Sequence, residues 1–486
     1  MNYLELLRLA FPEAHLIVTA LVVLTLGLTR HRAGKFVWLI AAVGLVLGMV
    51  AILRLPQNAA LPNSILVVTP LTSFFKLICL ALALFTVLLA RRSSFSRHQA
   101  EYLATILFAT VGLMLLVGSE ELLMIFIGLE LTGLSLYLLT GFDKNDVRSA
   151  EAGLKYFLFG STASAFTLFG LSFVYGMSGT TELSALGQRL AASPVPPLLA
   201  AGIVMTLVGF AFKIAAAPFH LWAPDAYQGG PIPSAALIAS GSKVASFVVL
   251  GKMVLIGFGP IAGSADWHAM VAGWVPLLAA MAALSIVIGN LVALAQTNVR
   301  RLLAYSAVAH SGYTLLGLVA GGREGFSATL FYTVVYAFTL IGAFGVVAFV
   351  RRETGGDNLE HFSMLRLRSP LLAGCMAVFM LSLAGLPPLA GFFGKFYLFN
   401  VVLRSGGSHG LLWLVCLALF GSLISLYYYL VVLKVIFVGD AQSATTFPVA
   451  QPDLIQRFAV GVLAAVILLL GLLPETLVAH IRAALS

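Results

Sequence analysis

The stretch VGFAFKIAAAPFHLWAPDAYQGGPIP, Val208–Pro233, decides how this chain folds. Its first half continues an apolar run that begins near Leu198, and Lys213 lies midway along that run. A charged side chain there costs about 2.5–3.5 kcal/mol on membrane-insertion scales. Five residues later, Pro218 has no N–H to donate, and its ring clashes with the carbonyl of Ile214. The stretch therefore predicts a membrane helix that breaks one turn after a buried lysine, where freed backbone groups face protein or water. The alternative is that the lysine reaches the membrane interface beside an incidental kink.

Composition places the whole chain in a membrane. Of 486 residues, 60% are hydrophobic and only 10% are charged, which excludes a soluble domain. The apolar runs predict an all-α polytopic protein with about fourteen transmembrane helices. The predicted spans are roughly 14–29, 36–53, 66–90, 102–118, 121–140, 152–176, 196–220, 232–257, 270–295, 302–320, 326–350, 371–402, 410–437 and 456–480.

The basic residues indicate topology rather than a nucleic-acid partner. The net charge is +9, but the arginines and lysines outside the spans gather in loops that follow odd-numbered spans. The richest of these loops are Arg30–Lys35, Arg91–Arg97, Lys144–Arg148 and Arg351–Arg368. By the positive-inside rule these loops are cytoplasmic, so both termini face outward. The expected surroundings are a lipid bilayer and other membrane chains.

A second break predicts an internal repeat. In MLSLAGLPPLAGFFGKFYLF, the Gly-Pro-rich segment precedes Lys395 in the middle of span 12. Two interrupted helices with central lysines, five spans apart, are typical of transporters built from inverted repeats. We expect one membrane domain, 1–486. It divides into three N-terminal spans (1–98), a first five-span repeat (spans 4–8, 100–258), a second (spans 9–13, 268–438) and a last span (454–486).

Lysine and arginine are separated in a way that favours proton transfer. All 19 arginines lie in loops or at span ends, whereas seven of nine lysines lie inside spans. An ammonium group can lose its proton when it is desolvated, and a guanidinium effectively cannot. For Lys76, Lys252 and Lys434, which lie nearer the span ends, we favour side chains that extend to the interface.

Five polar side chains form the predicted site. Glu130 is the carboxylate deepest in a predicted span, and Lys213 is its expected partner. Lys243 lies in the middle of the next span, His310 can carry a proton near neutral pH, and Lys395 follows the second break. Together they predict a polar file through the middle of the bilayer, as expected of a proton or cation translocator.

Other candidates are weaker when each is taken alone. Lys155 lies near the cytoplasmic end of its span, and His220, Tyr305, Tyr332 and Tyr336 lie on or beside spans between the two halves. A single buried histidine or tyrosine is more often a hydrogen-bonded core residue. The three cysteines, Cys79, Cys375 and Cys416, lack the clustered spacing of iron–sulfur or zinc sites, and no G-x-G-x-x-G is present. We therefore expect no cofactor and no metal on this chain.

Five stretches carry a family resemblance: GLELTGLSLYLLTGF, KYFLFGSTASAFTLFG, GFAFKIAAAPFHLWAPDAYQGGPIP, NVRRLLAYSAVAHSGY and LSLAGLPPLAGFFGKFYLF. The chain resembles, over essentially its whole length, the antiporter-like membrane subunits of the proton-pumping NADH:quinone oxidoreductase, respiratory complex I. The opening FPEAHLIVTALVVLTLGL is similar to the subunit N branch. Subunit M usually has a glutamate where this chain has Lys395.

The resemblance implies roles for individual residues. Glu130 and Lys213 would be the coupled pair, Lys243 the bridging lysine, Lys395 the distal lysine and Lys155 a further family lysine. It also implies a bacterial inner-membrane complex that couples electron transfer from NADH to quinone to proton pumping. FMN, iron–sulfur clusters and quinone would then lie on partner subunits, which comprise homologous membrane chains and a peripheral redox arm.

Three alternatives stay open on the sequence alone. The chain could belong to a multisubunit sodium/proton antiporter, or to a ferredoxin- or hydrogenase-linked relative in the same superfamily. It could also be a structural subunit whose polar file is inherited but idle.

Overall fold

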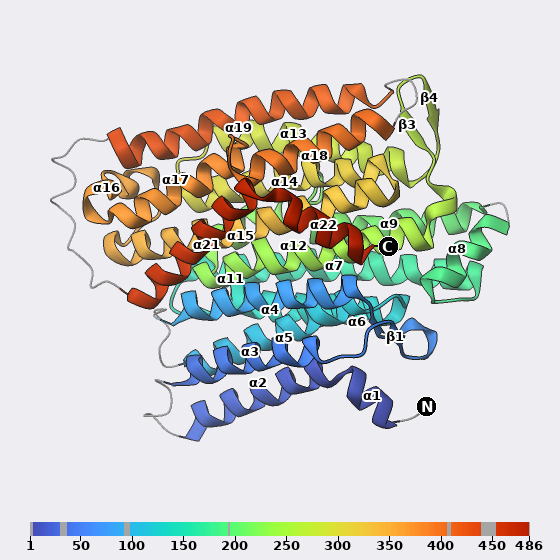
Figure 1. The fold of residues 1–486 in the computed structure, drawn as a ribbon, viewed down its shortest axis with the longest axis horizontal. Helices are drawn as coiled ribbons and strands as arrows, with labels where there is room; N and C mark the ends of the chain where they lie inside the picture. The colour runs from blue at the N-terminus through green and yellow to red at the C-terminus, as the bar shows by residue number, and fades with distance from the viewer. Residues whose placement is uncertain are drawn as a thin grey trace.

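The structure, a computed structural model, describes residues 3–29, 36–91, 98–192, 195–405, 410–438 and 453–485. The basic loop at 30–35 and most of the loop at 91–97 lie outside the described residues. Long helices run side by side in one bundle, and both termini lie at the same end of it (Figure 1). An even number of spans requires that arrangement.

The N-terminal part packs along one side of the bundle (blue in Figure 1). It consists of α1 (Tyr3–Leu9), α2 (Phe11–Thr29), α3 (Val37–Leu53), the antiparallel pair β1 (Ala59–Ala60) and β2 (Val67–Val68) around the 3₁₀ turn η2 (Pro62–Ser64), and α4 (Pro70–Ala90).

The first predicted repeat contains α5 (Gln99–Gly118), α6 (Leu122–Thr140), α7 (Val147–Ser178), α8 (Leu183–Ala192), α9 (Pro197–Lys213), α10 (Trp222–Gly229), α11 (Ile232–Leu237), the π-helical turn η4 (Ile238–Ser242), α12 (Lys243–Lys252) and a second π-helical turn, η5 (Met253–Gly257). Polar N-caps fix several of these starts. Glu121 accepts a bond from the Met124 N–H at the start of α6, and Asp146 accepts one from the Arg148 N–H at the start of α7.

The second predicted repeat follows a short connection formed by η6 (Gly259–Ile261) and the antiparallel pair β3 (Ser264–Asp266) and β4 (Ala269–Val271). It contains α13 (Trp274–Leu294), α14 (Val299–Ala320), α15 (Gly322–Thr354), η7 (Leu359–Phe362), α16 (Leu365–Arg368), α17 (Pro370–Ala384), α18 (Ala390–Ser405) and α19 (Leu412–Val438). The chain continues with α21 (Leu454–Leu472) and α22 (Pro474–Ala484).

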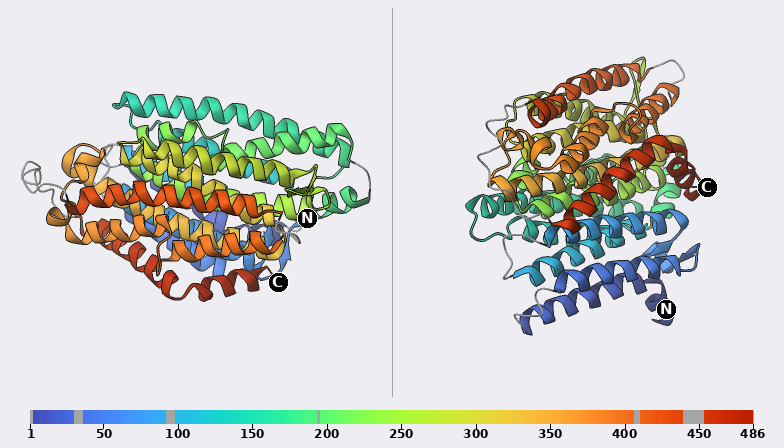
Figure 2. Two further views of the ribbon diagram at one scale, coloured as in Figure 1. Left: turned by 90° about the horizontal axis from the view of Figure 1, so that it is seen from above. Right: turned by 60° about the vertical axis from the view of Figure 1, so that its left-hand side comes forward.

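These helices confirm the predicted fold class. Eleven described helices are long and apolar enough to cross a membrane, and three shorter apolar helices, α3, α9 and α17, bring the number to fourteen. The two predicted breaks are present, between α9 and α10 and between α17 and α18. The third span of each predicted repeat is unusually long, with 32 residues in α7 and 33 in α15. The views in Figure 2 show the helices of both halves packed in the same bundle.

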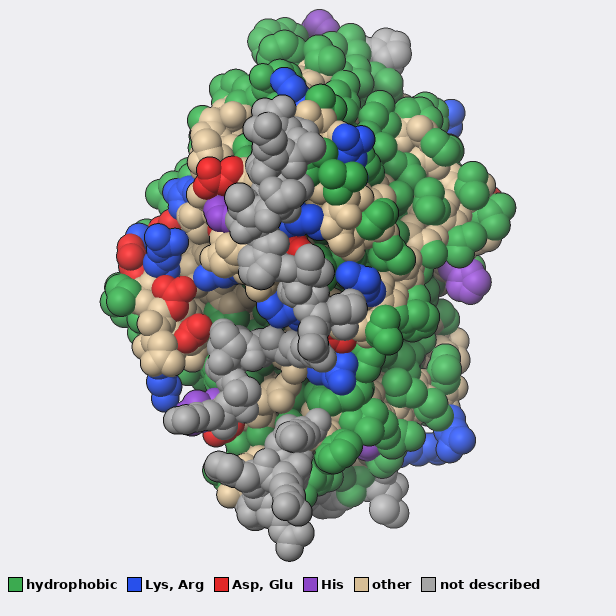
Figure 3. Space-filling view, turned by 90° about the vertical axis from the view of Figure 1, so that its left-hand side faces the viewer, with side chains coloured by type: hydrophobic (Ala, Val, Ile, Leu, Met, Phe, Trp, Pro, Cys, Tyr) green, Lys and Arg blue, Asp and Glu red, His purple; other side chains and the backbone are tan. Residues whose placement is uncertain are grey.

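Charge gathers at the end of the bundle opposite the termini. Figure 3 shows blue and red side chains grouped on this end, with hydrophobic side chains spread over the flanks. The described loops after odd-numbered spans lie here, including 141–146 and 355–369. This is the end that the basic loops predict to be cytoplasmic.

Candidate functional site

The first break is held open by serines from α13 and α14. Helix α9 ends at Lys213, and the Ile214 carbonyl that follows accepts a 2.5 Å hydrogen bond from Ser311 Oγ on α14. The Ala217 N–H donates to Ser285 Oγ on α13 at 2.8 Å. Backbone groups freed by the break therefore face protein, as the sequence predicts.

Glu130 and Lys213 share one small cavity. Both line a space of about 20 Å³ between α6, α7 and α9, which is room for about one water molecule. No direct ion pair joins them among the described residues, and the Glu130 carboxylate instead accepts a 2.5 Å bond from Ser164 Oγ on α7. The structure brings the predicted pair to one cavity that has room for about one water molecule.

Lys243 reaches the same break from the other side. Its buried Nζ donates to the Ala307 carbonyl at 2.5 Å and to Ser311 Oγ at 2.7 Å, and it lies 5.1 Å from the centre of the Tyr336 ring. Because Ser311 also donates to the Ile214 carbonyl, a single hydroxyl links Lys243 to the residue that follows Lys213.

His310 forms the centre of a tyrosine cluster. Its Nδ1 lies 2.5 Å from the Tyr332 hydroxyl and its Nε2 lies 3.0 Å from the Tyr429 hydroxyl, which also bonds Ser306. The Tyr336 ring, which faces Lys243, has its centroid 4.9 Å from that of His310. The predicted histidine is therefore buried between Lys243 and the second half of the molecule.

Lys395 completes the file on α18. Its Nζ donates to the Ala384 carbonyl at 3.0 Å, where α17 ends, and to Ser422 Oγ on α19 at 2.8 Å. It also lies 5.2 Å from the centre of the Tyr313 ring, whose centroid is 5.7 Å from that of His310. Rings and hydroxyls thus connect the two lysines that flank the histidine.

The remaining candidates lie at the edge of this file or outside it. Lys155 is 42% exposed and forms ion pairs with Glu151 at 2.6 Å and with Asp225 on α10 at 3.0 Å. His220 lies in the first break, with the centroid of its ring 6.4 Å from that of Tyr305. The structure does not bring Lys155 to the buried file.

Two of the three lysines expected at the interface are buried instead, so that prediction was wrong. Lys76 is 1% exposed and lies 2.6 Å from Glu13, and Lys252 is 2% exposed and lies 3.1 Å from Glu120. These ammonium groups are paired with carboxylates, Glu13 on α2 and Glu120 in the connection between α5 and α6. Lys434 is exposed, as expected.

Sequence reasoning missed the hydroxyl groups that connect the charges: Ser164, Ser311, Tyr313, Ser422 and Tyr429. Ser311 directly follows His310, which was the one available signal. The others depend on which helices meet, and the sequence does not show that.

The fold and the site together define an antiporter-like membrane protein. Two interrupted helices, each with a buried lysine, flank a buried bridging lysine and a histidine, and hydroxyl groups and aromatic rings lie between them. The comparisons with known proteins name the family.

Residues 119–425 match the family model described as "NADH:quinone oxidoreductase/Mrp antiporter, TM". NADH-quinone oxidoreductase subunit N 2 of Acidobacterium capsulatum is 45% identical, with 99% of each chain covered. Subunit N of Desulforamulus reducens is 40% identical, with 87% of each chain covered. A chain of Thermus thermophilus respiratory complex I is 34% identical, with a TM-score of 0.80 and coverage of 96% of this chain and 98% of that one.

A chain of the Mrp complex from Dietzia sp. is only 20% identical but superposes with a TM-score of 0.83, over 98% of this chain and 97% of that one, which shows a shared fold alone. The chain belongs to the NADH-quinone oxidoreductase subunit N family.

Proposed function

We propose that this chain is a proton-translocating membrane subunit of a NADH:quinone oxidoreductase. The observation that carries the proposal is the buried file from Glu130 to Lys395. Glu130 and Lys213 share a cavity, Ser311 links Lys243 to the residue after Lys213, and the rings of Tyr336 and Tyr313 lie between His310 and the lysines on either side. The relatives are named as subunits of NADH-quinone oxidoreductases, which indicates the redox reaction to which proton translocation is coupled. A chain with a merely structural role has little reason to keep four buried ionisable groups at about 3 kcal/mol each.

The proposed mechanism begins at the first break. Quinone reduction elsewhere in the complex changes the position or charge of groups near Glu130, which alters the water-filled gap to Lys213. Lys213 then gives up a proton, because a desolvated ammonium that loses its counter-charge favours the neutral amine. Ser311 Oγ and the Ile214 carbonyl hold Lys243 next to this point, so Lys243 is the next proton carrier.

The second half passes the proton on. His310 exchanges protons with the hydroxyls of Tyr332 and Tyr429, and Tyr313 lies between His310 and Lys395. Lys395 carries the proton in the second half, the file then releases a proton on the outward side, and a new proton from the cytoplasmic side restores Lys213. Lys155, paired with Asp225 at the cytoplasmic end of the first break, has a supporting role in proton uptake.

Redox groups are assigned to partner subunits. The three cysteines lie on different helices, and the sequence has no nucleotide-binding glycine motif, so FMN, iron–sulfur clusters and quinone would be held elsewhere in the complex.

Neighbouring membrane chains would cover the apolar flanks. Rows of large apolar side chains are exposed on α6 and α7 and on α13 and α19, which include Leu134, Phe169, Leu291 and Phe420. We place the chain in the bacterial inner membrane with both termini outward, because the basic loops lie at the opposite end. The division into repeats at 100–258 and 268–438 stays a prediction.

The test uses the complete complex in proteoliposomes with Lys213→Ala and Lys395→Ala, and Lys434→Ala as a matched control on the exposed end of α19. We expect both buried-lysine variants to lose NADH:quinone turnover and proton pumping together by at least about tenfold, since a positioned proton carrier contributes roughly 10²–10⁴-fold. Rates of turnover and proton pumping equal to those of the Lys434→Ala control would refute the proposal. Sodium-coupled pH changes without NADH would indicate an antiporter instead.

A further inference from the structure

A second charged cluster lies where α2, α4, α5 and α12 meet, away from the file described above. On its inner side, Glu13 of α2 and Lys76 of α4 form a 2.6 Å ion pair, with both side chains at most 4% exposed. Within the described part of the chain, Glu13 Oε2 and Ser73 Oγ, one turn before Lys76, are buried without a hydrogen-bond partner. Buried polar atoms in this state mark places for internal water.

The other half of the cluster is at the C-terminal end of α5. Lys252 Nζ donates to the Val117 carbonyl at 3.0 Å and lies 3.1 Å from Glu120. Lys76 reaches the same turn, because a Cβ placed on Gly118 would lie 2.8 Å from its Nζ. Two ammonium groups therefore converge on the negative end of one helix dipole.

Helix α12 connects this cluster to the central file. Its first residue is Lys243 and its last is Lys252, and each adjoins a π-helical turn, η4 before and η5 after. Ser246 lies about 4.5 Å along the axis from Lys243 and about 9 Å from Lys252, at 1.5 Å per residue. Its buried hydroxyl has no hydrogen-bond partner among the residues described, so it is a further place for water.

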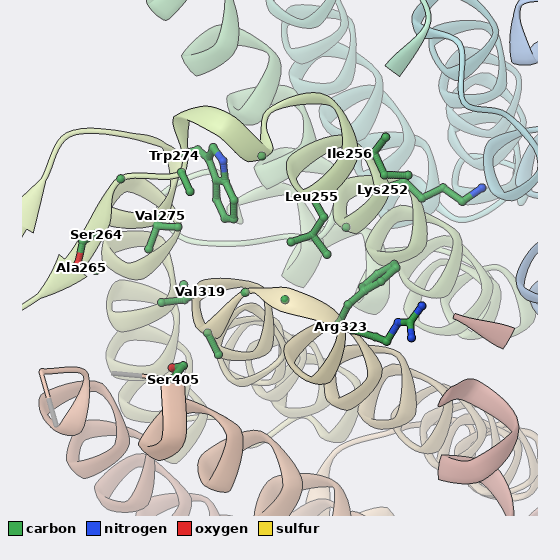
Figure 4. Close-up of a pocket in the computed structure, with 18 of the residues that line it drawn as sticks. Lys252, Leu255, Ile256, Ser264, Ala265, Trp274, Val275, Val319, Arg323 and Ser405 are labelled. Atoms are coloured by element: carbon green, nitrogen blue, oxygen red, sulfur yellow. The ribbon is translucent and has the colours of Figure 1, made fainter. Parts of the chain in front are cut away.

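A pocket of about 780 Å³ opens beside the cluster at the end of the bundle that carries the termini. Lys252 and Glu120 line it from the interior, and Arg323 and Ser405 are exposed at its mouth. In Figure 4 the Lys252 side chain leaves the pocket wall and points toward the blue part of the chain. The lysine therefore separates the pocket from the Glu13–Lys76 pair, while Glu120, 22% exposed, faces the pocket.

We propose that Lys252 and Glu120 form a proton outlet to this pocket, which acts as an aqueous vestibule on the outward side. The inference rests on the proposed function. A proton from Lys243 reaches Lys252 through water at Ser246. One N–H bond at Lys252 Nζ then breaks as an O–H bond forms on the Glu120 carboxylate, and Glu120 passes the proton to pocket water. Nothing is oxidised or reduced.

The neighbouring charges fit this role. Glu13 offsets the charge of Lys76, which weakens the repulsion between the two lysines. Asp266 and Arg323, the other charged residues that line the pocket among those described, carry opposite charges and leave its net charge near zero. Stability alone does not account for two buried pairs, because replacing such pairs by apolar residues is often neutral or stabilising.

The decisive variant is the neutral pair Lys252→Met with Glu120→Gln in the intact complex in proteoliposomes, compared with Lys434→Met. The double change keeps the volume and removes both charges together, so neither partner is left buried and unpaired. We expect the assembled variant to lose proton pumping by at least about tenfold, as for loss of a positioned proton carrier. Pumping equal to that of Lys434→Met would overturn the outlet.

A labelling measurement covers the case in which the double variant does not assemble. Leu255 lines the pocket, so Leu255→Cys, in a background with the exposed Cys416 replaced by serine, should react with a membrane-impermeant thiol reagent added from the outward side. Reaction only from the opposite side, or no reaction in folded protein, would overturn the vestibule.

The two proposals fail in different ways. If Lys213→Ala abolishes pumping but the neutral pair does not, the outlet is wrong and the proposed function stands. If Lys213→Ala and Lys395→Ala both leave pumping intact, the proposed function is wrong.

Discussion

The two broken helices differ in what lies beside their lysine. Lys213 ends the first half of its helix and shares a cavity with the carboxylate of Glu130. Lys395 lies on the second half of its helix, and among the described residues its hydrogen-bond partners are neutral, the Ala384 carbonyl and Ser422 Oγ. A moving negative charge can therefore control the first lysine directly, whereas the second responds to its solvation.

The breaks also differ in their backbone. In each, a residue just after the helix end is left-handed: Ala215 with φ 56° in the first and Gly385 with φ 85° in the second. For a residue with a Cβ this conformation costs about 1–2 kcal/mol, so the first break holds strain that the second avoids. A Cβ on Gly385 would also lie 2.9 Å from Lys395 Cδ. The second break therefore needs glycine for space as well.

Finally, only the first break is held by arginines from α14 in the described structure. Arg300 donates to the Gly230 carbonyl at 2.8 Å, just after α10, and pairs with Asp357 at 2.5 Å. Arg301 binds Asp225 on α10 at 2.9 Å. The half of the first broken helix that follows the break is thus anchored to α14.

The largest expected effect tests what the two breaks share. Lys213→Arg and Lys395→Arg keep the charge but remove the ability to release a proton. We expect each to lower pumping and turnover by at least about tenfold, measured in proteoliposomes against Lys434→Arg. If either variant pumps normally, proton transfer through that lysine is excluded.

The next prediction tests the difference in partners. Glu130→Gln removes the controlling charge of the first break, and we expect turnover to fall about tenfold. This is less than the roughly 10²–10⁴-fold contribution of a positioned acid–base group, because Glu130 controls Lys213 and does not itself carry the proton. Ser422→Ala removes the hydrogen bond that Lys395 donates to an uncharged hydroxyl. Such a bond is worth about 1 kcal/mol, so we expect turnover to fall about fivefold or less. Equal losses in the two variants would show that the breaks are controlled alike.

Exchanging the left-handed residues should have opposite effects. Gly385→Ala adds about 1–2 kcal/mol of strain and pushes on the Lys395 stem, so we expect lower thermal stability and slower turnover. Ala215→Gly relieves strain at the matched position and should preserve both. Thermal melting of the purified complex and turnover assays distinguish them, and a harmful Ala215→Gly would contradict this account.

The smallest effect concerns the arginine anchor. Burial acts to raise the pKa of Asp357, but Arg300, Asn298 and Arg351 outweigh it and hold the pKa below the usual aspartate range. The stabilisation is therefore fully present above the ordinary aspartate value of about 3.9 and is lost as pH falls through the lowered folded-state pKa.

Asp357→Asn should accordingly lower the melting temperature at neutral pH by a few degrees, about 2–4 °C for each kcal/mol of lost stability. The melting temperature of the variant should also change less as the pH is lowered. Asp143→Asn at the same end of the molecule is the control. An unchanged acid dependence in Asp357→Asn would assign the acid-sensitive step to another group.

Much of the fold was predictable because membrane helices leave a strong sequence signal. Runs of about twenty apolar residues give the spans, and prolines next to Lys213 and Lys395 give the breaks, since these features are local along the chain. The π-helical turns that flank α12 were not predicted. They depend on how one helix fits its neighbours, and no residue type requires them.

The site was predictable in its charges but not in its connections. A buried lysine is conspicuous in an apolar span, so Lys213, Lys243 and Lys395 were identified directly. The interface assignment failed for Lys76 because its partner, Glu13, is distant in sequence and comes from another helix. Pairing between helices is set by packing, which no single span encodes.

Ser311 gives the file a direction. Its hydroxyl has one hydrogen, yet two carbonyl oxygens lie within reach, Ile214 at 2.5 Å and Ala307 at 3.0 Å. When that hydrogen points at Ile214, an oxygen lone pair is open to the Lys243 ammonium, and hydrogen bonds run in one sense from the bridging lysine to the first break. When the hydrogen points at Ala307, the hydrogen bond to Ile214 is broken and the lysine is no longer connected to the first break. A single rotation about one C–O bond can therefore connect or disconnect the two halves of the molecule without any helix moving.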